Sequence, residues 1–138
     1  MITQINHIGI AVESLEATIP FYRDQLRLPL VGIEEVTDQK VRVAIFRIGE
    51  VHIELLEPTD PESPIARFLE KKGQGIHHIA LQTDDIEGEI ENMRSNQIEM
   101  IDVVPRPGAH GNQIAFLHPR STGKVLTEIC QHGEEQAH

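Results

Sequence analysis

Cysteine and tryptophan are nearly missing from this sequence, which contains one cysteine, Cys130, and no tryptophan. A single cysteine excludes an intramolecular disulfide framework, and Cys130 stands among apolar residues, where a thiol usually packs rather than reacts. No stretch approaches the roughly 18 consecutive apolar residues of a transmembrane helix. The N-terminus also lacks the basic and apolar regions of a secretory signal. These absences predict a soluble cytoplasmic protein with no membrane partner.

Basic residues are also scarce, because 12 Lys and Arg face 22 Asp and Glu, which gives a formal net charge of −10. Proteins that bind nucleic acids carry a basic run or stripe, so we expect no nucleic-acid partner. The glycine-rich loops that bind nucleotides and the serine motif of hydrolases are absent as well. The sequence therefore predicts no organic cofactor, although an anionic small ligand stays possible, because local charge can oppose net charge.

What the chain does contain is a repeat. Residues 6–12 read Asn-His-Ile-Gly-Ile-Ala-Val, and residues 77–83 read His-His-Ile-Ala-Leu-Gln-Thr. Each half of the chain then ends in a strand-like segment with a glutamate, Glu54 in the first half and Glu128 in the second. Because 138 residues suffice for one domain with a sizeable core, two such halves indicate a single site to which both contribute.

The hydrophobic periodicity of each half follows the order strand, helix, three strands. It predicts one domain over residues 1–138, with a first module at about 4–57, a linker at 58–74 and a second module at about 75–131. The expected strands are 4–12, 30–36, 41–48, 51–57, 76–83, 99–104, 113–117 and 125–131; the expected helices are 14–26, 63–71 and 84–96. Helices and strands mixed in this way predict an α+β fold.

Strand parity separates the candidate site residues from the packing residues, since successive side chains in a strand point to opposite faces. His7 and Gly9 share the face opposite Ile8 and Ile10. The same alternation puts His78 with Ala80, Glu54 opposite its aliphatic neighbours, and Glu128 opposite Ile129. All four candidates therefore lie on the less bulky face of their strands.

Two imidazoles and two carboxylates form a ligand set that suits Zn, Co, Ni, Mn or Fe(II). A buried glutamate without a partner is costly, and a bound cation removes that cost. The sequence therefore predicts one divalent-metal site made of His7, Glu54, His78 and Glu128. His77 falls on the helix-facing side of its strand, where we expect it to pack.

Two further histidines are candidates for substrate contacts. His52 shares the strand face of Glu54, and His110 lies in the loop of residues 105–112, which is rich in Gly and Pro. Long loops in compact domains are often functional.

On these residues the chain resembles the vicinal oxygen chelate superfamily, which contains glyoxalase I, bleomycin-resistance proteins and extradiol dioxygenases. Within it the chain is most similar to the methylmalonyl-CoA epimerases, over about residues 4–131. The stretches that carry the resemblance are 6–12, 54–58, 63–69, 75–80, 108–111, 116–119 and 125–128. The resemblance implies two tandem βαβββ modules that form a curved mixed sheet, or half-barrel, around a central metal site.

The resemblance also implies a function. The superfamily's metal ligands correspond to His7, Glu54, His78 and Glu128, and the position of Glu54 is Gln in some members. The implied reaction is metal-dependent epimerisation at C2 of methylmalonyl-CoA through a stabilised enolate, an isomerase activity, with Glu128 as catalytic base and ligand. Some epimerases have a second glutamate at the position of Val43. Valine transfers no proton, so the second acid/base group stays open, with a bound water, His52 or Glu50 as candidates.

Other functions compatible with the residues are a glyoxalase I-type lyase, which would use the same four ligands on a glutathione hemithioacetal, and a non-catalytic drug-binding resistance module. An extradiol dioxygenase uses three protein ligands, and a fourth carboxylate disfavours it. Four Phe and one Tyr are few for an aromatic drug pocket. We expect a homodimer that pairs through apolar edge strands such as 41–48. The residues that contact CoA are left open among Arg42, Arg47, Arg106, Arg120 and Lys124.

Overall fold

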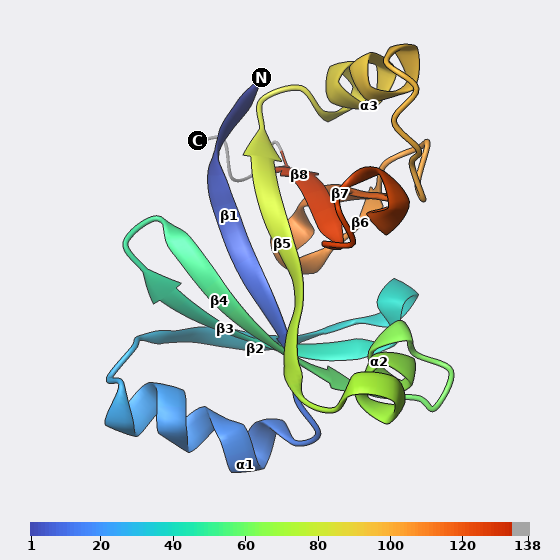
Figure 1. The fold of residues 1–138 in the computed structure, drawn as a ribbon. Coiled ribbons are helices and arrows are strands. Elements are labelled where there is room, and N and C mark those ends of the chain that lie inside the picture. The colour runs from blue at the N-terminus through green and yellow to red at the C-terminus, as the bar shows by residue number, and fades with distance from the viewer. Residues whose placement is uncertain (134–138) are drawn as a thin grey trace. The chain divides into compact units, whose positions relative to one another are not determined.

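The structure is a computed structural model, and it describes residues 1–133. The chain forms two compact units. The N-terminal unit consists of His7–His77, and the C-terminal unit consists of Met1–Asn6 with His78–His138. Strands β1 (Ile2–Ala11) and β5 (Gly75–Thr83) each contribute residues to both units. Figure 1 labels the elements in chain order.

In the N-terminal unit, the strands follow the order β2-β3-β4-β1. β2 (Leu30–Val36) is antiparallel to β3 (Val41–Ile48), and β3 is antiparallel to β4 (Val51–Pro58). The second half of β1 runs parallel to β4. The remaining elements of this unit are α1 (Leu15–Pro20), the π-helical turn η1 (Phe21–Gln25), the 3₁₀ turn η2 (Thr37–Gln39) and α2 (Pro64–Lys72).

In the C-terminal unit, the first half of β1 is followed by the strand order β5-β8-β7-β6. β5 is parallel to β8 (Thr127–Gln131), which is antiparallel to β7 (Gln113–Leu117). The remaining elements are α3 (Ile86–Ser95), the short β6 (Arg106–Pro107) and the 3₁₀ turns η3 (Ala109–Gly111) and η4 (Pro119–Ser121). Both units thus mix helices with a strand order that repeats, which confirms the predicted α+β class.

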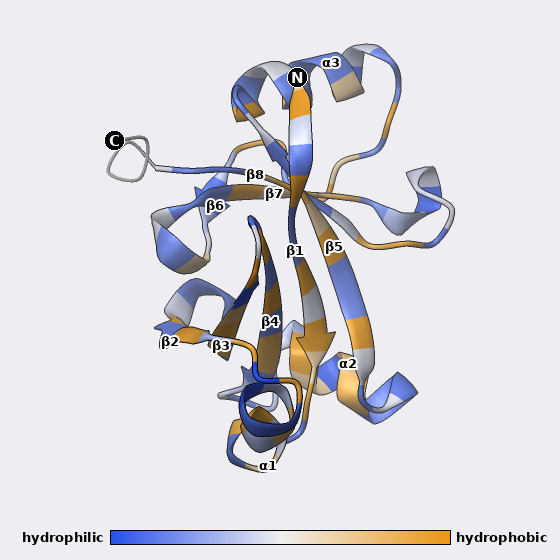
Figure 2. Ribbon diagram, turned by 90° about the vertical axis from the view of Figure 1, so that its left-hand side faces the viewer, coloured by the Kyte–Doolittle hydropathy of each residue, from blue (hydrophilic) through white to orange (hydrophobic). Residues whose placement is uncertain are grey.

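Each unit buries one aliphatic face of its strands against a helix. In the N-terminal unit, Leu15 and Ile19 of α1 join Phe46 and Leu55 in one buried cluster. In the C-terminal unit, Ile86 and Ile90 of α3 pack in the same way with Ala115, Leu117 and Ile129. Alternating hydropathy of the same kind is visible as bands of blue and orange along β5 (Figure 2). Cys130 is fully buried in a neighbouring apolar cluster, so its predicted packing role is confirmed.

The two main helices begin in equivalent ways. Ser14 accepts a hydrogen bond from the backbone of Ala17, and Asp85 accepts one from Gly88, so each helix has a side-chain N-cap. The backbone N–H of Leu15 donates to Glu57 Oε2 at 2.9 Å, and that of Ile86 donates to Gln131 Oε1 at 2.8 Å. Glu57 lies three residues after Glu54, and Gln131 lies three residues after Glu128. The strand bearing Glu54 or Glu128 is thereby fixed to its helix.

Three sequence-based expectations are wrong in detail. The helix expected at 14–26 ends as an α-helix at Pro20 and continues as a π turn, because proline has no N–H to donate. No strand forms at 99–104 within the described residues, apart from a bridge at Met100. There the Asp102 carboxylate accepts the Phe116 N–H that a neighbouring strand would otherwise pair, and pairing resumes at β6.

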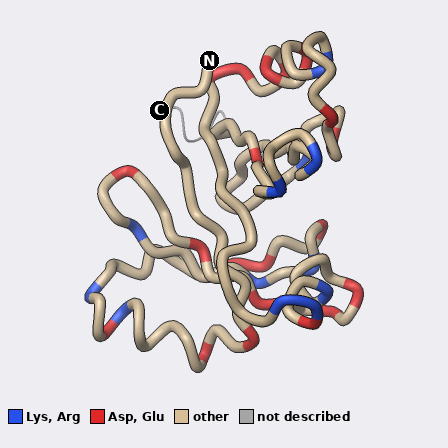
Figure 3. The backbone as a smooth tube through the Cα atoms, in the orientation of Figure 1, with Lys and Arg blue, Asp and Glu red and all other residues tan. Residues whose placement is uncertain are grey.

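The third correction concerns the edge strand. Residues 41–48 form β3, which is hydrogen-bonded to β2 on one side and to β4 on the other, so β3 is not an edge. β2 stands at the outer end of that strand order instead, and its Val31 and Ile33 are exposed. No helix within residues 1–133 has the length and apolar character needed to span a bilayer. Lys and Arg are spread over several elements among Asp and Glu (Figure 3).

Candidate metal centre

The first candidate pair lies in the N-terminal unit, on two adjacent parallel strands. His7 on β1 and Glu54 on β4 are both buried, each 4% exposed. His7 Nδ1 lies 3.4 Å from Glu54 Oε2. The parity predicted from the sequence is borne out by the packing on the other face, where Leu55 is buried in the helix-facing cluster and Ile10 and Ile53 pack against it.

The second pair lies in the C-terminal unit in an equivalent arrangement. His78 on β5 and Glu128 on β8 are 4% and 3% exposed. His78 Nε2 lies 3.4 Å from Glu128 Oε1. The His78 ring also meets the Phe116 ring edge-to-face, with 5.5 Å between centroids. The imidazole of His78 is therefore held by a carboxylate and an aromatic ring.

The strand register shows that the two pairs are built by the same rule. Gly9, two residues after His7, is the cross-strand partner of Glu54. Ala80, two residues after His78, is the cross-strand partner of Glu128. A small residue beside each glutamate leaves the strand face next to the carboxylate without a bulky neighbour. The repeat detected in the sequence is thus a repeat of backbone geometry as well.

Burial has opposite effects on the two members of the first pair. It lowers the pKa of His7 to about 3, with a smaller contribution from nearby His52. It raises the pKa of Glu54 to about 8, and the nearby Glu34 carboxylate adds to this. Desolvation penalises whichever form is charged, so without a cation both side chains favour their neutral forms near neutral pH.

This chemistry fits a divalent cation. A metal needs a neutral imidazole and an ionised carboxylate, and the low pKa of His7 already supplies the first. Glu54 would lose its proton on binding, and the cation would compensate the buried negative charge that burial otherwise disfavours. The second pair offers the same donor types at the same separation.

The other candidate histidines lie in different surroundings. His52 is half-buried on β4, and His7 is its cross-strand partner on β1, so His52 lies beside the first pair. His77 packs edge-to-face on Phe68 at 5.0 Å between centroids, as its predicted helix-side position implies, and burial lowers its pKa to about 4. His110 is half-buried in η3 with a left-handed backbone, φ 61°.

One residue of the N-terminal unit was missed by sequence reasoning. Glu34 on β2 is the cross-strand partner of Val43 on β3, and it is half-buried. Its negative charge contributes, after burial, to the raised pKa of Glu54. Val43 itself is 2% exposed. Glu50, a sequence candidate for proton transfer, lies exposed in the turn between β3 and β4.

Several of the basic residues considered for CoA contacts are engaged in ion pairs. Arg42 pairs with Glu57, Arg106 with Asp102 and Arg120 with Glu99, each at 3.2 Å. The guanidinium of Arg106 also lies over the Phe116 ring, 5.7 Å from its centroid. These ion pairs do not assign a CoA site, which stays a prediction for this group of residues.

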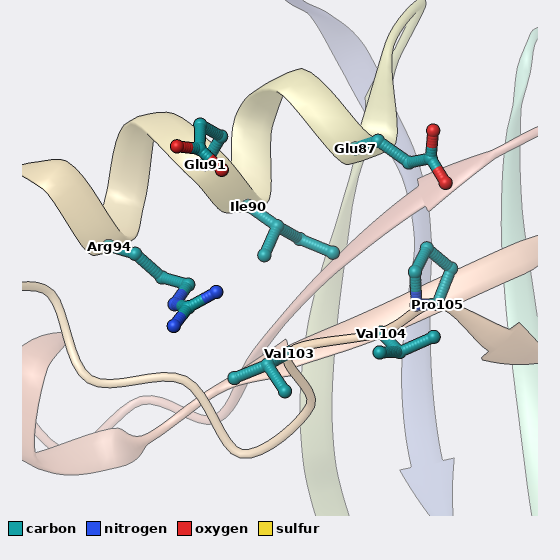
Figure 4. Close-up of a pocket in the computed structure, with 7 residues that line it drawn as sticks. All are labelled: Glu87, Ile90, Glu91, Arg94, Val103, Val104 and Pro105. Carbon is teal, nitrogen blue, oxygen red and sulfur yellow. The ribbon is translucent and has the colours of Figure 1, made fainter.

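The C-terminal unit also carries a pocket between α3 and the segment that precedes β6 (Figure 4). Ile90, Val103, Val104 and Pro105 form its apolar part, and the charged side chains around it come from α3. None of the seven lining residues is one of the four candidate ligands or their neighbours in the strands. The pocket is therefore separate from the His78–Glu128 pair.

Comparisons with known proteins find solved structures that are similar over almost the whole chain. A solved structure of hypothetical protein BH1468 from Bacillus halodurans C-125 is 50% identical, with a TM-score of 0.92 and 95% of each chain covered. A structure of methylmalonyl-CoA epimerase in complex with methylmalonyl-CoA and NH4+ is 36% identical, with a TM-score of 0.93 and 97% of each chain covered.

A curated relative points in the same direction. The ethylmalonyl-CoA/methylmalonyl-CoA epimerase of Cereibacter sphaeroides is 36% identical over 95% of this chain and 99% of its own length. Residues 6–116 match the family model described as the glyoxalase/bleomycin resistance protein/dioxygenase superfamily. The chain therefore belongs to the glyoxalase/bleomycin resistance protein/dioxygenase superfamily, and its relatives include methylmalonyl-CoA epimerases.

Proposed function

We propose that this protein is an isomerase that inverts the configuration at C2 of methylmalonyl-CoA or a close 2-alkylmalonyl-CoA. The observation that carries the proposal is the pair of buried His–Glu contacts, His7 with Glu54 and His78 with Glu128, built by the same register rule in both units. The similarity to epimerases over nearly the whole chain supports the same reaction.

We further propose that these four side chains hold one divalent cation, from the group Zn, Co, Ni, Mn or Fe(II). When bound, the cation would supply a positive charge that stabilises negative charge developing on the substrate oxygens. The buried imidazole of His7 is already in its metal-binding, neutral form. Glu54 and Glu128 would supply the carboxylates that neutralise the ion.

C2 of a malonyl thioester lies between two carbonyl carbons, so removal of its proton gives a delocalised enolate. Glu128 is the proposed group that removes or returns this proton on one face of C2. General acid–base catalysis of this kind contributes about 10²–10⁴-fold to a rate. His52 and His110 stay candidates for contacts with the acyl group. A homodimer and a cytoplasmic location also stay predictions, with the exposed strand β2 replacing β3 as the pairing edge.

The test is proton exchange at C2. Metal-loaded protein is incubated with one epimer of methylmalonyl-CoA in deuterated water, and C2 is followed by NMR. We expect rapid deuterium uptake with interconversion of the epimers. Both should disappear after chelation and in Glu128→Ala, while Glu35→Gln, an exposed change on β2, should behave as wild type.

Absence of uptake above the rate without enzyme, in protein shown to contain metal, would reject the epimerase function. Turnover of a glutathione hemithioacetal by the same sample would then assign a glyoxalase-type lyase, since the same ligands serve both reactions. Activity with ethylmalonyl-CoA, measured in parallel, would define how large an alkyl group the site accepts.

A further inference from the structure

We propose that Arg47 binds a phosphate group of the CoA part of the substrate, at the exposed end of a row of side chains that begins at His7. The proposal rests on the function proposed above. A CoA thioester carries a diphosphate and a 3′-phosphate. A chain with a formal net charge of −10 therefore needs a local cation to bind it.

Strand register places Arg47 in one row with His7. His7 on β1 is the cross-strand partner of His52 on β4, and His52 is the cross-strand partner of Arg47 on β3. The three strands are consecutive in the strand order of the N-terminal unit (Figure 1). Because cross-strand partners project to the same face of a sheet, Arg47 lies on the face that carries the His7–Glu54 pair.

Exposure to solvent increases along this row. His7 is 4% exposed, His52 is half-buried and Arg47 is exposed. Toward the other end of the same strands, Leu56 and Val43 are buried on this face. Within the N-terminal unit, a charged ligand arm that starts at the buried pair therefore reaches water on the side of Arg47.

The adjacent row leaves space beside Arg47. Gly32 on β2 is the cross-strand partner of Ile45, and Ile45 is the cross-strand partner of Glu54. A Cβ added to Gly32 would have no atom of residues 1–133 within 4 Å. Arg47 follows Ile45 by two positions on the same face, so it borders open space rather than a packed side chain at Gly32.

Arg47 also differs from the other basic residues in strands. Within residues 1–133, Lys and Arg occupy three strand positions, Arg42, Arg47 and Arg106. Arg42 and Arg106 each have a carboxylate at 3.2 Å, whereas no carboxylate of residues 1–133 lies within ion-pair distance of Arg47. Arg42 stands five positions before Arg47, on the opposite face of β3. Its partner Glu57 accepts the N–H at the start of α1, which identifies that face as the helix side.

The distance along the row suits a phosphate better than the acyl group. Two strand spacings, about 10 Å, separate the backbone of Arg47 from that of His7. The thioester would lie at the proposed ion, and the pantetheine arm would carry the phosphates away from it. Arginine presents two parallel N–H donors that match the oxygens of a phosphate.

The experiment compares ligands with and without phosphates. Titration calorimetry measures the binding of propionyl-CoA, its 3′-dephospho form and propionyl-pantetheine to metal-loaded wild-type protein and Arg47→Gln. We expect the Kd of propionyl-CoA to rise about tenfold or more in Arg47→Gln, as for a lost hydrogen bond to a charged group. The Kd of propionyl-pantetheine should not change. Propionyl thioesters lack the second carboxylate, so these values do not depend on proton transfer at C2.

The 3′-dephospho ligand identifies which phosphate is bound. If Arg47→Gln no longer weakens the binding of this ligand, Arg47 binds the 3′-phosphate. If the weakening persists, Arg47 binds the diphosphate. Arg42→Gln, on the opposite face of the same strand, is the matched control and should bind all three ligands as the wild-type protein does. Arg47→Lys keeps the charge without the paired donors and should recover part of the affinity.

Melting temperatures of all variants are compared first. Wild-type affinity for propionyl-CoA in Arg47→Gln, or an absence of phosphate-dependent affinity in the wild-type protein, would overturn the proposal. Equal weakening of propionyl-pantetheine binding would also overturn it, because Arg47 would then contact the acyl or pantetheine part. A phosphate-dependent loss in Lys124→Gln alone would move the role to Lys124. Phosphate-dependent binding through Arg47 in wild-type protein that does not exchange the C2 proton would reject only the epimerase function.

Discussion

The two units contain the same His–Glu pair but surround it differently. Near the first pair, β2 and β4 contribute the titratable side chains Glu34 and His52. Beside the second pair, the neighbours are the Phe116 ring, which contacts His78, and the Arg106 guanidinium above that ring. Both pairs have small residues across the strand and nearly identical burial.

The two units share their backbone register but differ in the side chains around each His–Glu pair. The repeat of backbone register accounts for where the four donor side chains lie, and it is the same in both halves. The neighbours that are not repeated would account for any difference between the two pairs beyond the ion binding that we propose for both. One carboxylate can then serve chiefly as a ligand while the other also transfers a proton. Glu54 and Glu128 are equivalent by position but not by proposed role.

The largest expected difference between the two glutamates is in catalysis, and comparing Glu128→Gln with Glu54→Gln measures it. Glutamine keeps a ligand oxygen but cannot accept a proton from carbon. We expect Glu128→Gln to lower the rate of epimer interconversion by about 10²–10⁴-fold, because it removes a general base. We expect Glu54→Gln to lower it by less than about tenfold, because no proton-transfer step is lost. Interconversion is followed by NMR of the two epimers.

Cation content by elemental analysis is the control in this comparison, since both variants should still bind metal. Equal losses in the two variants, with cation retained, would show that the two glutamates have equivalent roles. A loss of cation from Glu54→Gln alone would show instead that the charge of Glu54, rather than its oxygen, holds the ion.

Sequence reasoning succeeds where the information is local and fails where it depends on strand pairing. The His and Glu positions and their parity follow from alternation along single strands, and both are visible in the printed sequence. Glu34 was missed because its relevance depends on the register of β2 with β3, which contains an irregularity between Leu30 and Gly32. Alternation within β2 alone gives no sign of that partner.

The order of strands is equally invisible to local patterns. The sequence analysis expects β3 at an edge, but β3 lies between two partners, as its many buried apolar residues fit. The segment 99–104 has strand-like composition, yet a side chain, the carboxylate of Asp102, takes a backbone N–H that would otherwise join the ladder. In both cases the hydrogen-bond partner lies outside the segment whose composition was read.

A second test of the comparison uses pH. The raised pKa of Glu54 means that the metal-free protein gains stability from protonated Glu54 below pH 4.5 and loses it as the pH rises toward 8. In the metal-bound protein that we propose, Glu54 would be ionised instead. The difference in melting temperature between metal-loaded and metal-free protein should therefore grow between pH 5 and about 8.

His7 should not contribute to that difference, because its pKa of about 3 keeps it neutral in both states over this range. In Glu54→Gln the growth with pH should be clearly smaller, and scanning calorimetry at fixed excess metal measures it. If the difference in melting temperature grows with pH as steeply in Glu54→Gln as in the wild-type protein, another ligand loses the proton when metal binds. The two His–Glu pairs would then not differ in this respect.

The smallest expected difference concerns how each helix is fixed to its strand. Glu57 accepts a hydrogen bond from the first N–H of α1, and Gln131 accepts the equivalent bond at α3. A bond to a charged acceptor contributes about 1.5–3 kcal/mol, against about 0.5–1.5 kcal/mol for a neutral one. A carboxylate also interacts favourably with a helix N-terminus. We therefore expect Glu57→Ala to lower the free energy of unfolding more than Gln131→Ala does.

Urea unfolding of the metal-free variants gives both values, and Arg42→Ala controls for the ion pair that Glu57 also makes at 3.2 Å. That pair is partly exposed, with side chains 47% and 20% accessible, so its own contribution should be within about 1 kcal/mol. Gln131→Ala also removes the bond that Gln131 Nε2 donates to the Asp84 carbonyl at 3.0 Å. If Glu57→Gln, which keeps an acceptor without the charge, costs no more than Arg42→Ala, the charge on Glu57 adds nothing at the helix end. The two units would then be equivalent in how their helices are fixed, and the asymmetry would be confined to the surroundings of the His–Glu pairs.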